Sequence, residues 1–265
     1  MTGRIGLAAA GAAVLLAGCA ASTRTVYVQH TPAQQSAAPS HASSATSAAR
    51  QAAGNNEREF ADGLASANSL IPSSVVAGPV MHAYRMVQHE LNQGDAAAGQ
   101  PDSAETVTEV PGGYQLCAPD TGNGSHCDVL TNFTTDSAGR VTGVSVNGVP
   151  VAGRIATGPV SRTGGLVVSG IVAYRSLSNA GKIFVTYKVH DVSYKAINSS
   201  PAALATFSGY SEDDFNSVDV STLAPGVTTY GYGLFGTTKI SGPFELRSND
   251  GYNRLLASST LHKVR

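Results

Sequence analysis

The spacing of hydrophobic positions changes along this chain and divides it into segments. Between residues 57 and 93 apolar side chains recur at spacings of three and four, which predicts amphipathic helix. After residue 105 the spacing becomes two, which is typical of strands whose side chains alternate between two faces. The sequence therefore predicts a minor helical part followed by a mostly β protein.

The helical segment and the strands behind it are expected to form a small α+β unit over residues 56–157. Pro79 suits the first turn of a helix, and Asn147-Gly148 is typical of a tight hairpin because both central residues need positive φ. A helix that covers one face of an antiparallel meander buries the apolar side of both. The expected strands cover residues 105–110, 113–118, 127–134, 140–146 and 149–155.

Residues 158–265 are expected to form a β-sandwich, because about seven short strands are separated by regular turn signals. The segment from Lys182 to Tyr194 alternates most clearly. One face holds Ile183, Val185, Tyr187 and Val189, and the other holds Thr186, Lys188 and His190, with Phe184 as the exception. Further strands are expected over residues 166–176, 203–208, 218–220, 227–235, 243–248 and 254–264.

The N-terminus carries the features of a secretory signal. An apolar run from Ile5 to Leu16 follows Arg4, and small residues come after it. As a helix this run would span only about 18 Å, which is too short for a hydrocarbon core of about 30 Å. We therefore expect an exported protein rather than one with a membrane-spanning helix at this position.

The motif Leu16-Ala17-Gly18-Cys19 resembles the lipobox of bacterial lipoproteins, with its order of aliphatic, small, Gly and Cys. In that family the cysteine sulfur receives a diacylglyceryl group and the preceding segment is removed. The resemblance implies a signal peptide over residues 1–18, and a lipidated Cys19 that holds the protein on the outer side of the cell membrane. An uncleaved anchor or a plain secretory signal is the alternative.

Residues 19–55 are rich in Ala, Ser and Pro and poor in large apolar side chains. Such a segment buries too little to offset the entropy of ordering, so we expect a disordered tether with a reach of roughly 30–36 Å. A short helix within the Ala-rich residues 45–53 is the alternative.

Cys117 and Cys127 form an even pair that remains once Cys19 is assigned to the lipid. Outside the cytoplasm such a pair predicts a disulfide, and closing this short loop stabilises the fold by about 3 kcal/mol. A metal site that uses both cysteines and His126 is the alternative, but no fourth ligand is evident.

The charge of the chain is low and balanced, with 17 Lys and Arg residues against 18 Asp and Glu. Binding to nucleic acid needs a basic footprint, and attraction to anionic lipid needs a basic cluster. The composition therefore excludes a nucleic-acid partner and an electrostatic membrane patch.

A second resemblance lies near the C-terminus. Leu223-Ala224-Pro225-Gly226 precedes the strand Val227 to Phe235, and Phe244-Glu245-Leu246 and then Asp250-Gly251 follow. This layout resembles the immunoglobulin-like, telokin-like domains of Gram-positive lipoproteins, and the whole chain is similar to actinobacterial lipoproteins of unknown role. The resemblance implies a fold and a location rather than an activity. Gly231 and Gly233 depart from the bulkier residues expected in that strand.

Sequence motifs for catalysis and cofactors are weak. Asp120-Thr121-Gly122 spells the tripeptide of aspartic proteases, but that mechanism needs two such carboxylates and the motif occurs once. His89-Glu90 lacks the second His of a zinc peptidase helix, and no Gly-x-Ser-x-Gly elbow is present. Glu212-Asp213-Asp214 could supply calcium ligands, although a solvated loop is the simpler interpretation. We therefore expect no cofactor and no metal.

Four tyrosines of the expected sandwich form a candidate binding face, namely Tyr210, Tyr230, Tyr232 and Tyr252. Tyrosine supplies contact area with a polar tip, although these rings could equally cover the core or a sheet edge. The sequence thus favours a membrane-anchored, non-catalytic module that binds an envelope protein or glycan. A hydrolase with its site between the two folded units, or a purely structural envelope protein, is the alternative.

Overall fold

The computed structural model describes residues 41–97, 99–119, 126–176, 182–193, 203–211, 214–216, 224–248 and 255–265. The expected signal peptide, Cys19, Asp120–Gly122, Glu212–Asp213, the expected strand 218–220 and Tyr252 lie outside these residues. Within the described part, neither helix is long and apolar enough to cross a membrane. Lipidation of Cys19 therefore stays a prediction.

Two helices precede the strands, α1 (His41–Ala65) and α2 (Gly78–Ala97). Pro79 stands in the first turn of α2, as the sequence predicted. Helix α1 begins within the segment expected to be disordered, so the expectation for residues 41–55 is corrected. Alanine is the strongest helix former, and the helix continues into Phe60 and Ala61, which are fully buried.

The first sheet is the expected antiparallel meander, with its five strands in the order in which they occur in the chain. At its last hairpin Asn147 and Gly148 have φ values of 50° and 76°, which confirms the predicted turn. The expected strand 149–155 is cut short, since its last residue, Ile155, pairs in the other sheet. The strands are β1 (Thr106–Val110), β2 (Gly113–Cys117), β3 (Cys127–Thr135), β4 (Val141–Val146) and β5 (Val149–Pro150).

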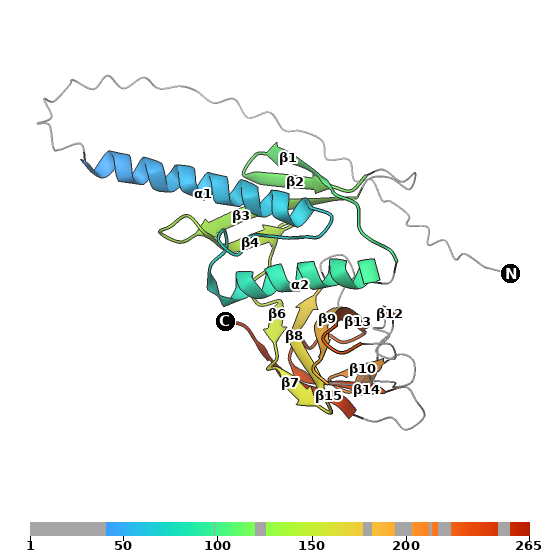
Figure 1. The fold of residues 1–265 in the computed structure, drawn as a ribbon. Coiled ribbons are helices and arrows are strands. Elements are labelled where there is room, and N and C mark those ends of the chain that lie inside the picture. Colours follow the sequence, from blue (N-terminus) through green and yellow to red (C-terminus); the bar gives the residue numbers. More distant parts are fainter. Residues whose placement is uncertain are drawn as a thin grey trace, which may run out of the picture. The chain divides into compact units, whose positions relative to one another are not determined.

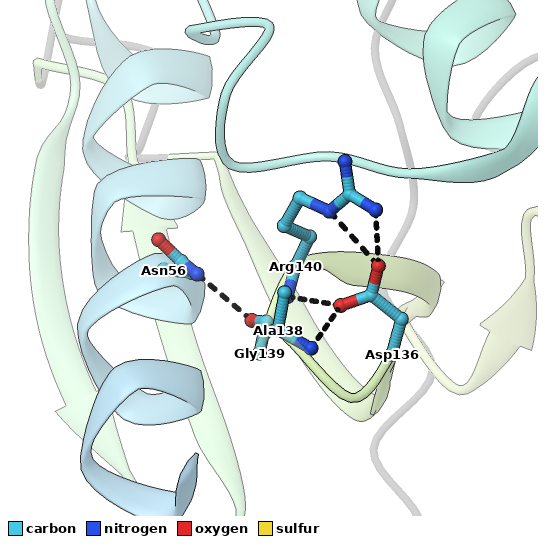
Figure 2. Close-up of polar contacts among 5 residues, drawn as sticks. All are labelled: Asn56, Asp136, Ala138, Gly139 and Arg140. Carbon is cyan, nitrogen blue, oxygen red and sulfur yellow. Dashed lines mark hydrogen bonds and ion pairs between the residues drawn. The ribbon is translucent and has the colours of Figure 1, made fainter. Parts of the chain in front are cut away.

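Polar contacts hold the β3–β4 turn, and one hydrogen bond joins this turn to helix α1 (Figure 2). Asp136 closes the turn, since its Oδ1 accepts from the backbone nitrogens of Ala138 and Arg140, each at 2.9 Å, and its Oδ2 pairs with the Arg140 guanidinium. Asn56 Nδ2 donates to Gly139 O at 2.9 Å. Gly139 has a φ of 76° and lies against the α1 backbone at Ala53, where a Cβ would not fit. The turn thus positions α1 on the meander.

The second sheet holds ten strands and is antiparallel throughout. Its path runs β11-β10-β14-β15-β6-β8-β9-β13-β12, with β7 paired to β8. The strands are β6 (Ile155–Thr157), β7 (Ser161–Thr163), β8 (Leu166–Arg175), β9 (Ile183–Asp191), β10 (Ala203–Phe207), β11 (Tyr210–Ser211), β12 (Asp214–Asn216), β13 (Thr228–Phe235), β14 (Gly242–Ser248) and β15 (Leu255–Lys263).

The two ends of this sheet pack face to face like a sandwich. Phe207 of β10 contacts Phe235 of β13 at a ring distance of 5.8 Å, and Tyr187 of β9 contacts Phe244 of β14 at 5.4 Å. These aromatic side chains belong to one buried cluster that joins both ends of the sheet. The predicted fold class, a helix-plus-meander part followed by a β-sandwich in a mostly β chain, is confirmed.

Helix α2 lies between the meander and the second sheet and contacts β4 on one side and β8, β9 and β13 on the other (Figure 1). Strand β8 is therefore buried on both faces. Ile171 and Ala173 belong to the sandwich core, whereas Val172 and Tyr174 belong to a second core shared with α1, α2 and the meander. Burial on both faces explains why β8 is a continuous apolar run rather than an alternating one.

Candidate functional site

The predicted tyrosine face is partly covered by α2. The rings of Tyr230 and His89 are 6.1 Å apart, and the Tyr232 hydroxyl donates to Asp95 Oδ1 at 2.7 Å. Tyr232 also lies so close to Gly94 that a Cβ there would meet its ring. The side chain of Tyr210, like all of Tyr252, lies outside the described residues. An open binding face built from the four tyrosines stays a prediction.

The predicted disulfide between Cys117 and Cys127 is present, and the two residues are directly paired across β2 and β3. A backbone bond from Ala118 N to His126 O, at 3.0 Å, continues this pairing into the loop. Both sulfurs are consumed by the bond, so the alternative of a metal site on these cysteines is overturned. The disulfide fixes one wall of a cavity that the sequence did not predict.

This cavity, hereafter the α2 cavity, consists of two adjoining hollows of about 230 and 430 Å³. They share several lining residues and run from the inner side of α2 to the disulfide loop. Volumes of this order are typical of sites for small molecules. The shared residues are Leu64, Ser69, Asn92, Asp102 and Glu105.

The walls of the α2 cavity come from both helices, from the meander and from the second sheet. Apolar side chains form much of the inner hollow, but polar side chains line both hollows, since Asp128 belongs to the inner one and Asp102 and Glu105 belong to both. A ligand would therefore meet carbon surface and charge side by side. The apolar lining residues are Leu64 of α1, Leu91 of α2, Leu116 of β2, Leu130 of β3, Val146 of β4 and Phe184 of β9.

Two buried tyrosines line the inner hollow, Tyr84 of α2 and Tyr174 of β8. They are only 3% and 6% exposed, and their ring centroids are 5.8 Å apart. Neither hydroxyl has a hydrogen-bond partner among the described residues. Neither hydroxyl oxygen is among the fully buried, unpaired side-chain atoms of the described residues, so both reach the hollow, where water or a ligand can contact them. The two hydroxyls are therefore available to a ligand.

Burial keeps both tyrosines in the neutral form. Burial is the main cause that raises the pKa of Tyr84, and Tyr174 and the negative charge of Asp128 raise it further. The pKa of Tyr174 is also raised chiefly by burial, while Arg154 opposes this effect. Each hydroxyl can therefore both donate and accept a hydrogen bond at neutral pH.

Three carboxylates, from Asp102, Glu105 and Asp128, lie along the polar side of the cavity. Burial raises the pKa of Glu105, and the charges of Asp128 and Asp102 raise it further. The pKa of Asp102 is raised by burial and then by Asp95. The smaller part of both pKa shifts therefore comes from neighbouring carboxylates, and the larger part comes from burial.

Neighbouring amides hold two of these carboxylates in place. Asn92, with its side-chain amide oriented to satisfy both neighbours, donates from nitrogen to Asp102 and accepts through oxygen from Ser69. Asn147 of the tight hairpin donates from Nδ2 to Asp128 Oδ1 at 2.6 Å. The hairpin residue that needs positive φ thus also positions a carboxylate of the cavity.

A further carboxylate outside this cavity, the buried Glu90, lies on α2 against the second sheet. Its Oε2 accepts from Thr186 Oγ1 at 2.7 Å, and its Oε1 is 3.8 Å from Lys188 Nζ. Burial raises the pKa of Glu90 to about 7, although Thr186 and Lys188 oppose the shift. With Arg85, Glu90 lines a separate hollow of about 260 Å³.

Sequence reasoning considered Glu90 only as part of an incomplete zinc-peptidase motif with His89, and it did not predict that Glu90 is only 1% exposed. Two signals could have found it. Glu90 follows the buried Val87 by three positions and therefore shares its helical face. The predicted polar face of β9, with Thr186 and Lys188, also needed a polar partner, and α2 supplies it.

The described part of the chain holds one contact between a histidine ring and a threonine hydroxyl, and no cluster of metal ligands. A histidine contacts a hydroxyl at His190 and Thr228, whose Nδ1 and Oγ1 are 2.9 Å apart, but these residues are exposed cross-strand neighbours. No carboxylate contacts His190 among the described residues. In the same residues no three His, Cys, Asp or Glu side chains lie close enough together to hold one metal ion.

Comparisons with protein-family models, curated proteins and solved structures found no match to this chain.

Proposed function

We propose that this protein is a lipid-anchored, extracytoplasmic binding protein that takes a small ligand into the α2 cavity and performs no catalysis of its own. The observation that carries the proposal is the pair of tyrosines Tyr84 and Tyr174, which are buried but line the cavity with hydroxyls that have no hydrogen-bond partner among the described residues. These hydroxyls can donate and accept hydrogen bonds when a ligand enters the cavity.

The location rests on two features that are independent of the cavity. The Leu16–Cys19 motif resembles a lipobox, which would attach the mature chain to lipid through Cys19. The disulfide between Cys117 and Cys127 is of a kind that persists in oxidising compartments. Both features support a protein that works outside the cytoplasm.

A hydrolase is the second candidate, because Glu105 lies in a cavity with its pKa raised by burial and by Asp128. A general acid has such a shift when it is paired with a carboxylate base. Neither His190 nor Thr228, the histidine and hydroxyl that contact each other, lines this cavity, and the lining tyrosines are neutral. Binding therefore explains more of the cavity than hydrolysis does.

The proposal can be tested on the full chain purified from its own membranes in mild detergent. Ser103 is exposed at the rim of the outer hollow, so Ser103→Trp should block entry without disturbing the core. Thr108→Trp, at an exposed position of β1 that does not line the cavity, is the matched control. Native mass spectrometry should find a bound small molecule on the wild type and on Thr108→Trp.

Loss of that molecule from Ser103→Trp alone would support the proposal. An equal amount of bound molecule on both variants, or none on the wild type, would contradict it. Turnover of the molecule by the wild type but not by Glu105→Gln would establish the hydrolase instead.

A further inference from the structure

We propose that the α2 cavity selects a small organic cation, an alkyl ammonium or guanidinium ion, which its carboxylates and the Tyr84 and Tyr174 hydroxyls hold together. This inference rests on the proposed function and names the chemistry of the ligand.

The charge of the lining is the first argument. Among the lining residues the three carboxylates face one histidine, His126, whose side chain is 71% exposed, and no Lys or Arg. Arg154 does not line the cavity, although its charge acts on Tyr174. The side chain of Asp128 is 41% exposed, and Asp102 is exposed as well. Charges interact more strongly in a half-buried site than in bulk water, because the effective dielectric constant is lower. An anion would be repelled from this wall, and a cation attracted to it.

The separation of the carboxylates is the second argument. A metal ion needs several ligand oxygens within about 2.6 Å of one point, and no such group of three exists among the described residues. An ammonium or guanidinium ion carries several N–H donors that point in different directions. Such an ion can therefore bond to Glu105 and to a second carboxylate that lies at a different position. A metal ion would need both carboxylates to converge on one point.

The aromatic and apolar walls are the third argument. A tyrosine hydroxyl can accept a hydrogen bond from an N–H of the cation while it donates one to a carboxylate. Both Tyr84 and Tyr174 would then have hydrogen-bond partners. Tyr84, Tyr174 and Phe184 also offer rings, with which organic cations interact favourably. The leucines of the inner hollow would cover the carbon skeleton of the ligand.

The crowding of negative charge at the wall supports the same conclusion. Burial and the neighbouring carboxylates raise the pKa of Glu105, so its ionised form is destabilised in the empty cavity. A bound cation relieves this repulsion and favours the ionised form. Binding should therefore release protons near the pKa of Glu105 and weaken as the pH falls through that range.

The probes are simple compounds that share one carbon chain. Calorimetric titrations of the full chain, in uncharged detergent at fixed ionic strength, use butylammonium and butylguanidinium chloride. Matched titrations use butanol, butyrate and calcium chloride. We expect heat of binding from one or both organic cations and none from the neutral, anionic or metal probe.

The variants test whether the bound cation occupies this cavity. Glu105→Gln preserves shape and should weaken cation binding about tenfold or more, because it removes a charge-assisted hydrogen bond. Tyr84→Phe should also weaken binding, since the hydroxyl alone is lost. Glu109→Gln makes the same change at an exposed position of β1 outside the cavity and should leave binding unchanged. Circular dichroism checks that each variant is folded.

Three results would overturn the inference: no binding of either organic cation, binding that Glu105→Gln leaves intact, or binding of calcium alone. Failure of the inference is distinguishable from failure of the proposed function. If butanol or butyrate binds and Ser103→Trp prevents it, the cavity is a binding site for another class of ligand. If no probe binds and no molecule is found on the native protein, both proposals fall.

Discussion

Gly170 and Glu90 meet where a bulge of β8 passes beneath α2. Gly170 has a φ of 63°, and a Cβ built on it would overlap Glu90 Oε1. The bulge shifts the β8–β9 register between Ser169 and Val172. The absence of a side chain at this one position therefore lets the buried carboxylate reach Thr186 and Lys188.

Gly170→Ala should destabilise the protein by about 2 kcal/mol or more, because it combines backbone strain with overlap against a buried carboxylate. Gly164→Ala is the matched control, since Gly164 has a φ of 58° but nothing lies within 4 Å of its Cβ position. That control should cost about 1 kcal/mol. Urea unfolding of both variants measures the difference, and equal losses would refute the role of the overlap.

Glu90 should make stability fall with rising pH. Burial raises its pKa from an ordinary value of 4.5 to about 7 in the fold, so the folded state holds the proton more tightly. The stabilisation from protonated Glu90 is complete below pH 4.5 and is lost as the pH rises through about 7. The loss amounts to about 3 kcal/mol.

Glu90→Gln removes this titration while it keeps an acceptor for Thr186. Unfolding free energies measured from pH 4 to 8 should therefore fall more steeply for the wild type than for the variant. Parallel pH profiles would mean that Glu90 does not hold the proton in the folded protein.

The disulfide should matter for both stability and ligand binding. Cys117→Ser with Cys127→Ser should lower the free energy of unfolding by about 3 kcal/mol. Ligand binding should weaken as well, because Pro119 and His126 of the closed loop line the outer hollow. Reduction of the wild type should reproduce both effects, and reductant should change nothing further in the double variant. Unchanged binding after reduction would show that the loop is not part of the site.

Cys19→Ala should release the protein from membranes, because it removes the sulfur that would carry the lipid. Fractionation of cells, together with the intact mass of the wild type, checks this. We expect a mass increase for the acylated chain that begins at Cys19. A variant that stays with the membrane, together with a wild type that carries no acyl mass, would contradict the lipid anchor.

The sequence predicted those features that depend on local periodicity. The alternation of β9 correctly placed Val185 and Tyr187 in the sandwich core, and Asn147-Gly148 correctly predicted a hairpin. The three-residue strands β6 and β7 were missed because they are too short to show a period. Helix α1 was expected to start later, because its first half lacks an apolar face.

The cavity could not be predicted because its parts are far apart in the chain. Tyr84 and Tyr174, which line it, meet only when α2 packs on β8. Each of these residues fits the ordinary spacing of hydrophobic positions in its own helix or strand. Their chemistry emerges from the packing of α2 between two sheets, which no local spacing specifies.

The double variant Tyr84→Phe and Tyr174→Phe tests the central claim most directly, because it removes only the two tyrosine hydroxyls that line the cavity. Native mass spectrometry of the full chain from its own membranes should find a small cationic molecule on the wild type and little or none on the double variant. The same molecule in equal amount on both proteins, or a wild type that carries nothing, would contradict the account.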